Sequence, residues 1–119
     1  MRKPFRFIAC LAFLAVQQAH GHAFLDHSEP AVGSQVATSP KSLKIWFTEK
    51  LEPSLSKIQV FDQNGKEIDR HDNRLFEGNP TILAVTLPML DPGRYEVVWR
   101  VVSVDTHVTT GKFSFEVTH

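Results

Sequence analysis

A tight turn leads directly into a long alternating strand in Leu90-Asp91-Pro92-Gly93-Arg94-Tyr95-Glu96-Val97-Val98-Trp99-Arg100-Val101-Val102. Successive side chains of a strand point to opposite faces, so one face of this strand is expected to be buried. That inward face would consist of Tyr95, Val97, Trp99 and Val101. A tyrosine at the start of a late strand, directly after such a turn, is typical of the tyrosine corner in Greek-key sandwiches. The stretch therefore predicts an all-β protein.

Short strands separated by turn residues continue this pattern along the chain. Alternation and β-branched residues predict further strands at residues 22–26, 43–48, 58–62, 67–69, 81–87 and 112–117. Asn64-Gly65 predicts a hairpin turn, and Pro53 limits the apolar residues around 51–55 to a single turn. Together these features predict an immunoglobulin-like Greek-key β-sandwich or barrel of about seven strands. Trp46, Trp99 and most phenylalanines are expected in its core.

The first 21 residues have the pattern of an export signal. A basic opening at residues 1–6 is followed by the apolar run 7–16 and by small residues at Ala19 and Gly21. The run is shorter than the roughly 20 apolar residues that span a bilayer. Residues 1–21 are therefore predicted to be a signal peptide that is removed. Residues 22–119 would form one mature domain that does not insert into a membrane.

The predicted mature domain differs from the whole chain in cysteine content and in charge. Cys10 leaves with the signal, so no disulfide and no thiolate ligand remains. All 13 acidic residues lie in residues 22–119, whereas three of the 13 basic residues, Arg2, Lys3 and Arg6, lie in the signal. The mature domain thus carries about three net negative charges when its histidines are neutral. Nucleic acid, which would need a basic face, is excluded as a partner.

A carboxylate and an imidazole lie two residues apart in residues 103–111, the segment expected to connect the last two strands. Residues i and i+2 of an extended chain point to the same side, so Asp105 and His107 are expected to hold one small target together. Loops at the end of a sandwich are exposed and free to carry function. By itself the spacing fits equally well with Asp105 capping a turn beside an ordinary surface histidine.

Cleavage after Gly21 would give His22 a free α-amine beside its imidazole. Both nitrogens can chelate one metal ion near neutral pH, because their reference pKa values are about 7.7–8.0 and about 6.5. With Asp105 and His107 they form a set of nitrogen and oxygen ligands that suits Cu(II). Met89, the single sulfur of the mature chain, is more typical of core filler, which disfavours Cu(I). His22, Asp105 and His107 are therefore candidate ligands for one Cu(II) ion, and from the spacing alone a set of ordinary surface side chains fits equally well.

Four other residues are weaker candidates for metal ligands. His27 is near His22 in sequence and is interpreted as a solvated turn residue. Glu49 follows a predicted strand and is interpreted equally well as a surface carboxylate. His71 lies in a polar stretch that is expected to be an exposed loop, and His119 is the C-terminal residue, which is expected to fray.

The sequence resembles the CopC-type periplasmic copper-resistance proteins along essentially the whole predicted mature chain. The segments that carry this resemblance are His22-Ala23-Phe24-Leu25, Ser28-Glu29-Pro30-Ala31 with Gly33, Phe47-Thr48-Glu49, Gly93-Arg94-Tyr95, Trp99-Arg100-Val101-Val102-Ser103, and Asp105-Thr106-His107 with Gly111. The resemblance implies an immunoglobulin-like domain that binds Cu(II) outside the cytoplasm. The family's site uses the mature N-terminal histidine, its amine, and a late aspartate and histidine, which correspond here to His22, Asp105 and His107.

The resemblance also carries implications beyond these three residues. It implies a periplasmic location and an association with an inner-membrane copper transporter, which is not fused to this chain. In some members a glutamate corresponding to Glu49 lies near the site. Members with a second site, for Cu(I), use a methionine-rich loop, and this chain lacks one.

Three functions follow from these observations. The favoured function is a soluble Cu(II) carrier or buffer in copper homeostasis or resistance, which is not an enzyme. The second is a copper-dependent oxidase or monooxygenase that uses the N-terminal histidine chelate. The third is a plain sandwich used for adhesion or assembly. The short domain, and Asp105 in a position that oxygen chemistry would need open, favour the carrier over the enzyme.

Overall fold

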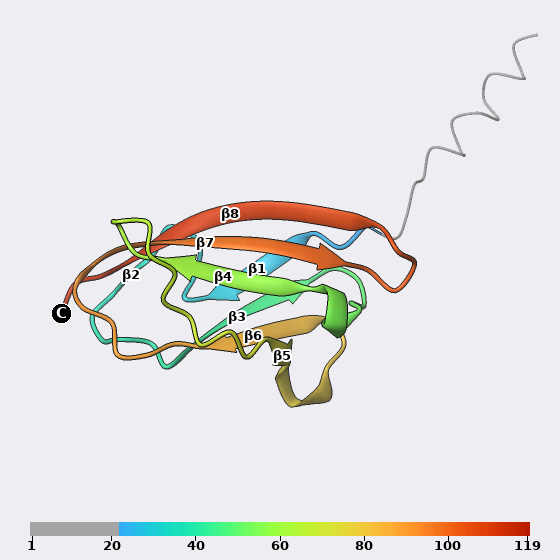
Figure 1. Cartoon of the computed structure of the whole chain (residues 1–119), viewed down its shortest axis with the longest axis horizontal. Helices are drawn as coiled ribbons and strands as arrows, with labels where there is room; N and C mark the ends of the chain where they lie inside the picture. The colour runs from blue at the N-terminus through green and yellow to red at the C-terminus, as the bar shows by residue number, and fades with distance from the viewer. Residues whose placement is uncertain (1–21) are drawn as a thin grey trace, which may run out of the picture.

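Two four-stranded sheets face each other in the computed structural model, which describes residues 22–119 (Figure 1). The predicted signal peptide, residues 1–21, lies outside the described residues. The first sheet has the order β1-β3-β6-β5, with β1 (Leu25–Glu29), β3 (Ser42–Phe47), β6 (Ile82–Thr86) and β5 (Arg74–Leu75). The second has the order β2-β8-β7-β4, with β2 (Gln35–Val36), β8 (Val108–Val117), β7 (Gly93–Val102) and β4 (Lys57–Phe61). The predicted immunoglobulin-like sandwich is confirmed, with eight strands.

The core between the sheets follows the alternation of the sequence. Buried side chains of β7 and β8 come from Tyr95, Val97, Trp99, Val101, Phe113, Phe115 and Val117, and those of β3 come from Leu43, Ile45 and Phe47. Each fully buried side chain of this size contributes about 1.5–3 kcal/mol relative to an exposed one. Without a disulfide in residues 22–119, this apolar layer is the main source of stability.

The tyrosine corner is present as predicted. The Tyr95 hydroxyl donates a hydrogen bond to the Asp91 carbonyl at 2.6 Å, and the Tyr95 ring stacks on Phe115 with centroids 5.6 Å apart. Burial raises the pKa of Tyr95, and the carboxylates of Asp91 and Asp62 raise it further. The bond ties the turn before β7 to the strand itself.

Several predicted elements differ from those in the structure. The first strand is β1, Leu25–Glu29, and the predicted 22–26 is wrong because residues 22–24 only lead into it. His27 therefore lies in a strand and not in a turn. The turn at Asn64-Gly65 forms, with the Gly65 amide donating to the Asp62 carbonyl at 2.9 Å. The return segment 67–69 is not a strand, because it makes only one bridge, between Glu67 and Phe61. β2 and β5, of two residues each, are too short to leave a periodic pattern.

The expectation for the two tryptophans is only half correct. Trp99 is buried in β7 and packs edge-on against Phe47, with centroids 5.2 Å apart. Trp46 is only partly buried, because it alternates with the inward Ile45 and Phe47 and so points outward. There it stacks on His27. One of the two 3-10 turns in the described chain, η1 (Pro53–Leu55), is the single turn predicted near Pro53, and the other is η2 (Phe76–Gly78).

Strands β7 and β8 form a regular antiparallel pair that positions the late loop. Their register runs without a shift from Gly93↔Val117 to Val102↔Val108, so the connection is only residues 103–107. The loop closes one end of the sandwich, and residues 22–24 enter at the same end (Figure 1). Among residues 22–119, no helix has the length and apolar character needed to cross a bilayer.

Candidate metal centre

The loop that carries Asp105 and His107 is a tight turn and not extended chain. The Ser103 amide donates to the His107 carbonyl at 3.0 Å, and the Thr106 amide donates to the Ser103 carbonyl at 2.8 Å. Thr106 has a φ of 73°, in the left-handed region that β-branched residues rarely adopt. The extended-chain reasoning for Asp105 and His107 was therefore wrong, although the two side chains do meet. His107 Nδ1 lies 3.2 Å from Asp105 Oδ1.

The buried hydroxyl of Ser103 fixes the orientation of the Asp105 carboxylate. Ser103 is buried, and its hydroxyl donates a hydrogen bond to Asp105 Oδ1. The same hydroxyl oxygen accepts a bond from the His107 amide at 3.3 Å. The bond from Ser103 lowers the pKa of the Asp105 carboxyl; desolvation opposes this shift, and His107 adds to it. Asp105 is thus held as an anion, with its side chain about half exposed.

Residues 23 and 24 anchor the start of the described chain beside this loop. Ala23 is fully buried, and its carbonyl accepts a hydrogen bond from the Thr109 hydroxyl of β8. The Phe24 amide donates to Thr48 Oγ1 at 2.9 Å, and the Thr48 amide donates to the Phe24 carbonyl at 2.9 Å. These bonds attach the segment to both sheets at once. The bonds of Ala23 and Phe24 therefore fix where the chain leaves His22.

The anchored segment brings His22 against His107. Their ring centroids are 4.4 Å apart, and the ring planes are inclined by 54°. Two imidazoles bound to one metal ion in neighbouring positions, each about 2.0 Å from it, have a centroid separation of this order. The structure thus brings His22, Asp105 and His107 together at the end of the sandwich, with the last two side chains about half exposed.

Three of the weaker candidate ligands, His27, Glu49 and His119, are not among the side chains that the structure brings together at His22. His27 stacks on Trp46 with centroids 4.3 Å apart, and its Nδ1 lies 2.7 Å from Asp26 Oδ2 on the outer face of β1. Glu49 is exposed and directly follows Thr48, the residue bonded to Phe24. His119 is exposed at the C-terminus, close to the end of β8.

Met89 is not the core filler that the sequence suggested. It is 86% exposed, in the connection between β6 and β7. That connection leads into Gly93, at the opposite end of β7 from the 103–107 loop. Its sulfur is therefore too remote to join His22 and His107 around one ion.

One group of side chains was missed in the sequence analysis. Glu67, Asp69 and His71 each offer a ligand atom, and these atoms all lie within 4.8 Å of one another. The signal was present as Glu-x-Asp-x-His, three ligand-type residues at alternate positions. It was overlooked because the surrounding residues 69–74 are uniformly polar and were interpreted as a loop.

The arrangement at His22, Asp105 and His107 has the chemistry of a cation site. It offers two imidazoles and one carboxylate, and it would gain a primary amine if the chain began at His22. In the full-length chain the His22 nitrogen is a peptide nitrogen. Nitrogen and oxygen ligands of this kind bind Cu(II) more tightly than other divalent first-row metals.

Comparisons with known proteins give a consistent result. The CopC domain matches residues 25–118. Protein YobA of Escherichia coli (strain K12) is 33% identical over 105 residues, which cover 87% of this chain and 85% of the relative. Copper resistance protein C of Xanthomonas campestris pv. juglandis is 34% identical over 113 residues, which cover 89% of this chain and 87% of the relative.

A solved structure extends the comparison to three dimensions. The crystal structure of CopC from Methylosinus trichosporium OB3b superposes with a TM-score of 0.77 at 35% identity, covering 82% of this chain and 94% of that one. The family match, the sequence relatives and the solved structure all point to the same family. The resemblance noted from the sequence is therefore confirmed, and this chain belongs to the CopC domain family.

Proposed function

We propose that this protein is an exported, non-enzymatic carrier or buffer that holds one Cu(II) ion at His22, Asp105 and His107. The observation that carries the proposal is the 4.4 Å separation of the His22 and His107 rings, which come from opposite ends of the chain. The name of the relative, copper resistance protein C, points to the same metal. The ion is the cargo, and the chain's contribution is a set of ligands already held in place.

The location and the partner follow from the same proposal. Residues 1–21 have the composition of a cleaved export signal, and only cleavage after Gly21 would supply the His22 amine. We therefore propose a periplasmic location. An inner-membrane copper transporter is the proposed exchange partner, as the sequence resemblance implies.

Titration of Cu(II) into the protein that begins at His22, in competition with a strong chelator, tests this function. We expect one tightly bound equivalent. Affinity no better than that of scattered surface imidazoles would contradict the carrier and favour a plain structural sandwich.

Adding a reductant and oxygen to the copper-loaded protein tests the alternative function, an oxidase or monooxygenase. The carrier predicts no sustained turnover, and steady oxygen consumption would overturn it.

Acid is expected to release the metal. Protonated imidazole and ammonium cannot ligate, so affinity for Cu(II) falls as the pH falls through their pKa range, about 6.5–8.0 for the unperturbed groups. The pKa of Asp105 is already lowered by Ser103, so its carboxylate stays ionised in this window. We expect affinity to fall at least about tenfold per pH unit below about pH 6. Chelator competition at several pH values measures this, and affinity that stays constant between about pH 7.5 and 5.5 would contradict it.

Replacement of Ser103 by alanine is expected to weaken Cu(II) binding without removing a ligand. The variant loses the hydroxyl that orients Asp105 and accepts from the His107 amide. Loss of such a supporting bond typically costs roughly 10–100-fold in metal affinity. The pKa of Asp105, followed by carboxyl NMR in the metal-free protein, should rise towards its ordinary value. Ser34→Ala is the matched control, because the Ser34 hydroxyl bonds a loop carbonyl away from the site. An unchanged Asp105 titration in Ser103→Ala would refute the role.

A further inference from the structure

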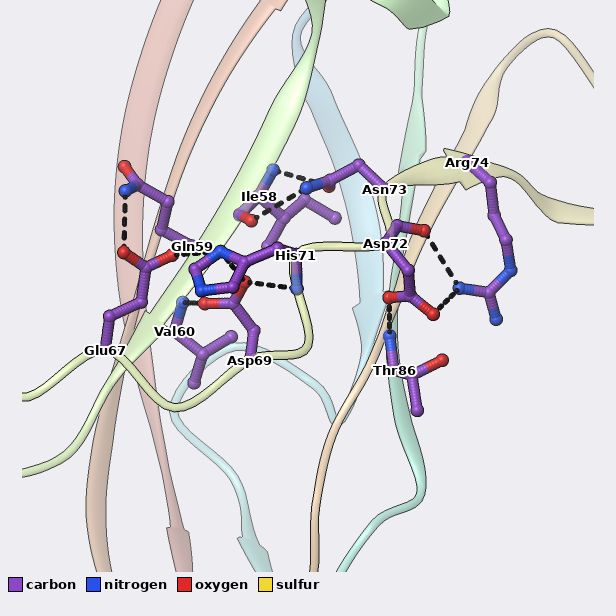
Figure 2. Close-up of polar contacts among 10 residues, drawn as sticks. All are labelled: Ile58, Gln59, Val60, Glu67, Asp69, His71, Asp72, Asn73, Arg74 and Thr86. Atoms are coloured by element: carbon purple, nitrogen blue, oxygen red, sulfur yellow. Dashed lines mark hydrogen bonds and ion pairs between the residues drawn. The ribbon is translucent and has the colours of Figure 1, made fainter.

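The segment that follows β4 and the turn at Asn64-Gly65 places three ligand-type side chains on one side of β4, the edge strand of its sheet. The Ile68 amide donates to the Val60 carbonyl at 2.8 Å, so the segment follows β4 without extending its ladder. Figure 2 shows Glu67, Asp69 and His71 converging over this edge. Alternate residues of this locally extended segment point the same way, which explains why the Glu-x-Asp-x-His spacing brings them together.

The separations within this group match those around a bound metal. His71 Nδ1 lies 3.3 Å from Glu67 Oε2 and 3.5 Å from Asp69 Oδ2. Ligand atoms about 2.0–2.2 Å from a tetrahedral metal lie about 3.4 Å from one another. Both separations from His71 Nδ1 therefore match those around a small divalent ion, and all three ligand atoms lie within 4.8 Å of one another.

Asp69 is the buried carboxylate of this group. Its side chain is only 1% exposed. Oδ1 accepts a hydrogen bond from the Val60 amide at 2.8 Å. Oδ2 points into the group, where it accepts a hydrogen bond from the His71 amide at 3.2 Å and lies 3.5 Å from His71 Nδ1. Within residues 22–119, neither Asp69 nor Glu67 forms an ion pair with a lysine or arginine. A buried carboxylate without a full cationic partner is costly, and a metal ion would supply that charge.

Surrounding hydrogen bonds hold the Glu67 carboxylate and the chain beyond His71 in place. Gln59 Nε2 donates to Glu67 Oε1 at 3.1 Å, which leaves Oε2 directed at His71. On the far side of the group, the Thr86 amide donates to Asp72 Oδ1 at 2.8 Å and fixes the chain beyond His71 (Figure 2). Outer hydrogen bonds of this kind orient ligands in metal sites.

We propose that Glu67, Asp69 and His71 form a second metal site, for a divalent transition-metal ion of the Zn(II) type. One imidazole and two carboxylates are ligands that such ions accept. His71 is 69% exposed, so the remaining coordination position opens to water. The site is separate from His22 and His107, because Val60 pairs with Val97 within β7 whereas the 103–107 loop lies beyond the end of that strand. It does not depend on the proposed copper function.

Zn(II) titration of a protein in which the first site has been removed tests the proposal. The background is the protein beginning at residue 22 with His22→Ala and His107→Ala, and binding is followed by calorimetry and by the imidazole NMR signals. We expect one equivalent of Zn(II), with the His71 signals shifting. Adding His71→Asn should abolish that equivalent. Asparagine is chosen because His71 has a φ of 60°, and asparagine tolerates this left-handed conformation.

His27→Asn in the same background is the matched control. His27 is also an exposed imidazole beside a carboxylate, but it has only Asp26 as partner. We expect this variant to retain the equivalent. Absence of Zn(II) binding in the background protein, or an equivalent that survives His71→Asn, would overturn the proposal. Loss of the equivalent in the His27 variant would overturn it as well. None of these outcomes affects the test of Cu(II) at His22 and His107.

Discussion

Replacement of His107 by alanine is expected to reduce Cu(II) affinity by at least about 100-fold, equivalent to about 2.8 kcal/mol. The change removes the imidazole that lies 4.4 Å from the His22 ring and 3.2 Å from Asp105. Loss of an outer hydrogen bond already costs roughly 10–100-fold in metal sites, so loss of a direct ligand should cost at least the upper end of that range. Chelator competition measures the affinity.

The stability of the metal-free protein should hardly change in His107→Ala. The side chain is 49% exposed, and substitutions at such positions usually alter the free energy of unfolding by less than about 0.5 kcal/mol. His27→Ala is the matched control, because His27 is also an exposed imidazole within 2.7 Å of a carboxylate. Equal losses of affinity in the two variants would contradict the assignment of His107 and indicate nonspecific binding to surface histidines.

Replacement of Gly111 by alanine is expected to destabilise the fold strongly. Gly111 pairs with Trp99, and a Cβ there would lie 2.3 Å from Trp99 Cζ2 and 2.6 Å from Cε2. The indole ring is buried against Phe47 and cannot move away freely. Overpacking of this kind costs about 1–3 kcal/mol or more. For a domain of this size each kcal/mol lowers Tm by roughly 4–8 °C, which thermal unfolding would measure.

A double-mutant cycle identifies the cause of the stability loss in Gly111→Ala. Trp99→Phe removes the ring atoms that a Cβ at residue 111 would meet. We therefore expect Gly111→Ala to cost much less in the Trp99→Phe background than in the original protein. The same cost in both backgrounds would mean that the contact with Trp99 is not the reason for a glycine at this position.

Most of the fold was predictable because its signals are local. The alternation of residues 95–101 determined which side chains are buried, and the turn before Tyr95 indicated the tyrosine corner that the structure contains. The segments that escaped prediction are those fixed by distant contacts. Gln35–Val36 is a strand only because β8 passes beside it. Trp46 was placed in the core together with the other aromatic residues of the strands, although its alternation with Ile45 and Phe47 indicated the outer face.

The candidate site was less predictable, because what positions it is not local. The sequence suggested Asp105 and His107 through an extended-chain argument, whereas a turn with Thr106 in the left-handed region brings them together. The supporting role of Ser103 depends on its burial, which the loop pattern did not reveal. Gly111 was grouped with the metal loop, although it lies in β8 and serves the packing of Trp99. No local pattern relates residue 22 to residue 107, and the sequence linked them only through their ligand chemistry and the family resemblance.

The central claim is that the Cu(II) site includes the α-amine of His22, and a comparison of two N-termini tests it most directly. One protein begins at His22, and the other carries a single glycine before it, so that all side chains are identical. The extension converts the amine into a peptide nitrogen and removes the chelate between that nitrogen and the His22 ring. Cu(II) affinity, measured by chelator competition at neutral pH, should fall by at least about 100-fold in the extended protein. Equal affinity of the two proteins would contradict the proposed site.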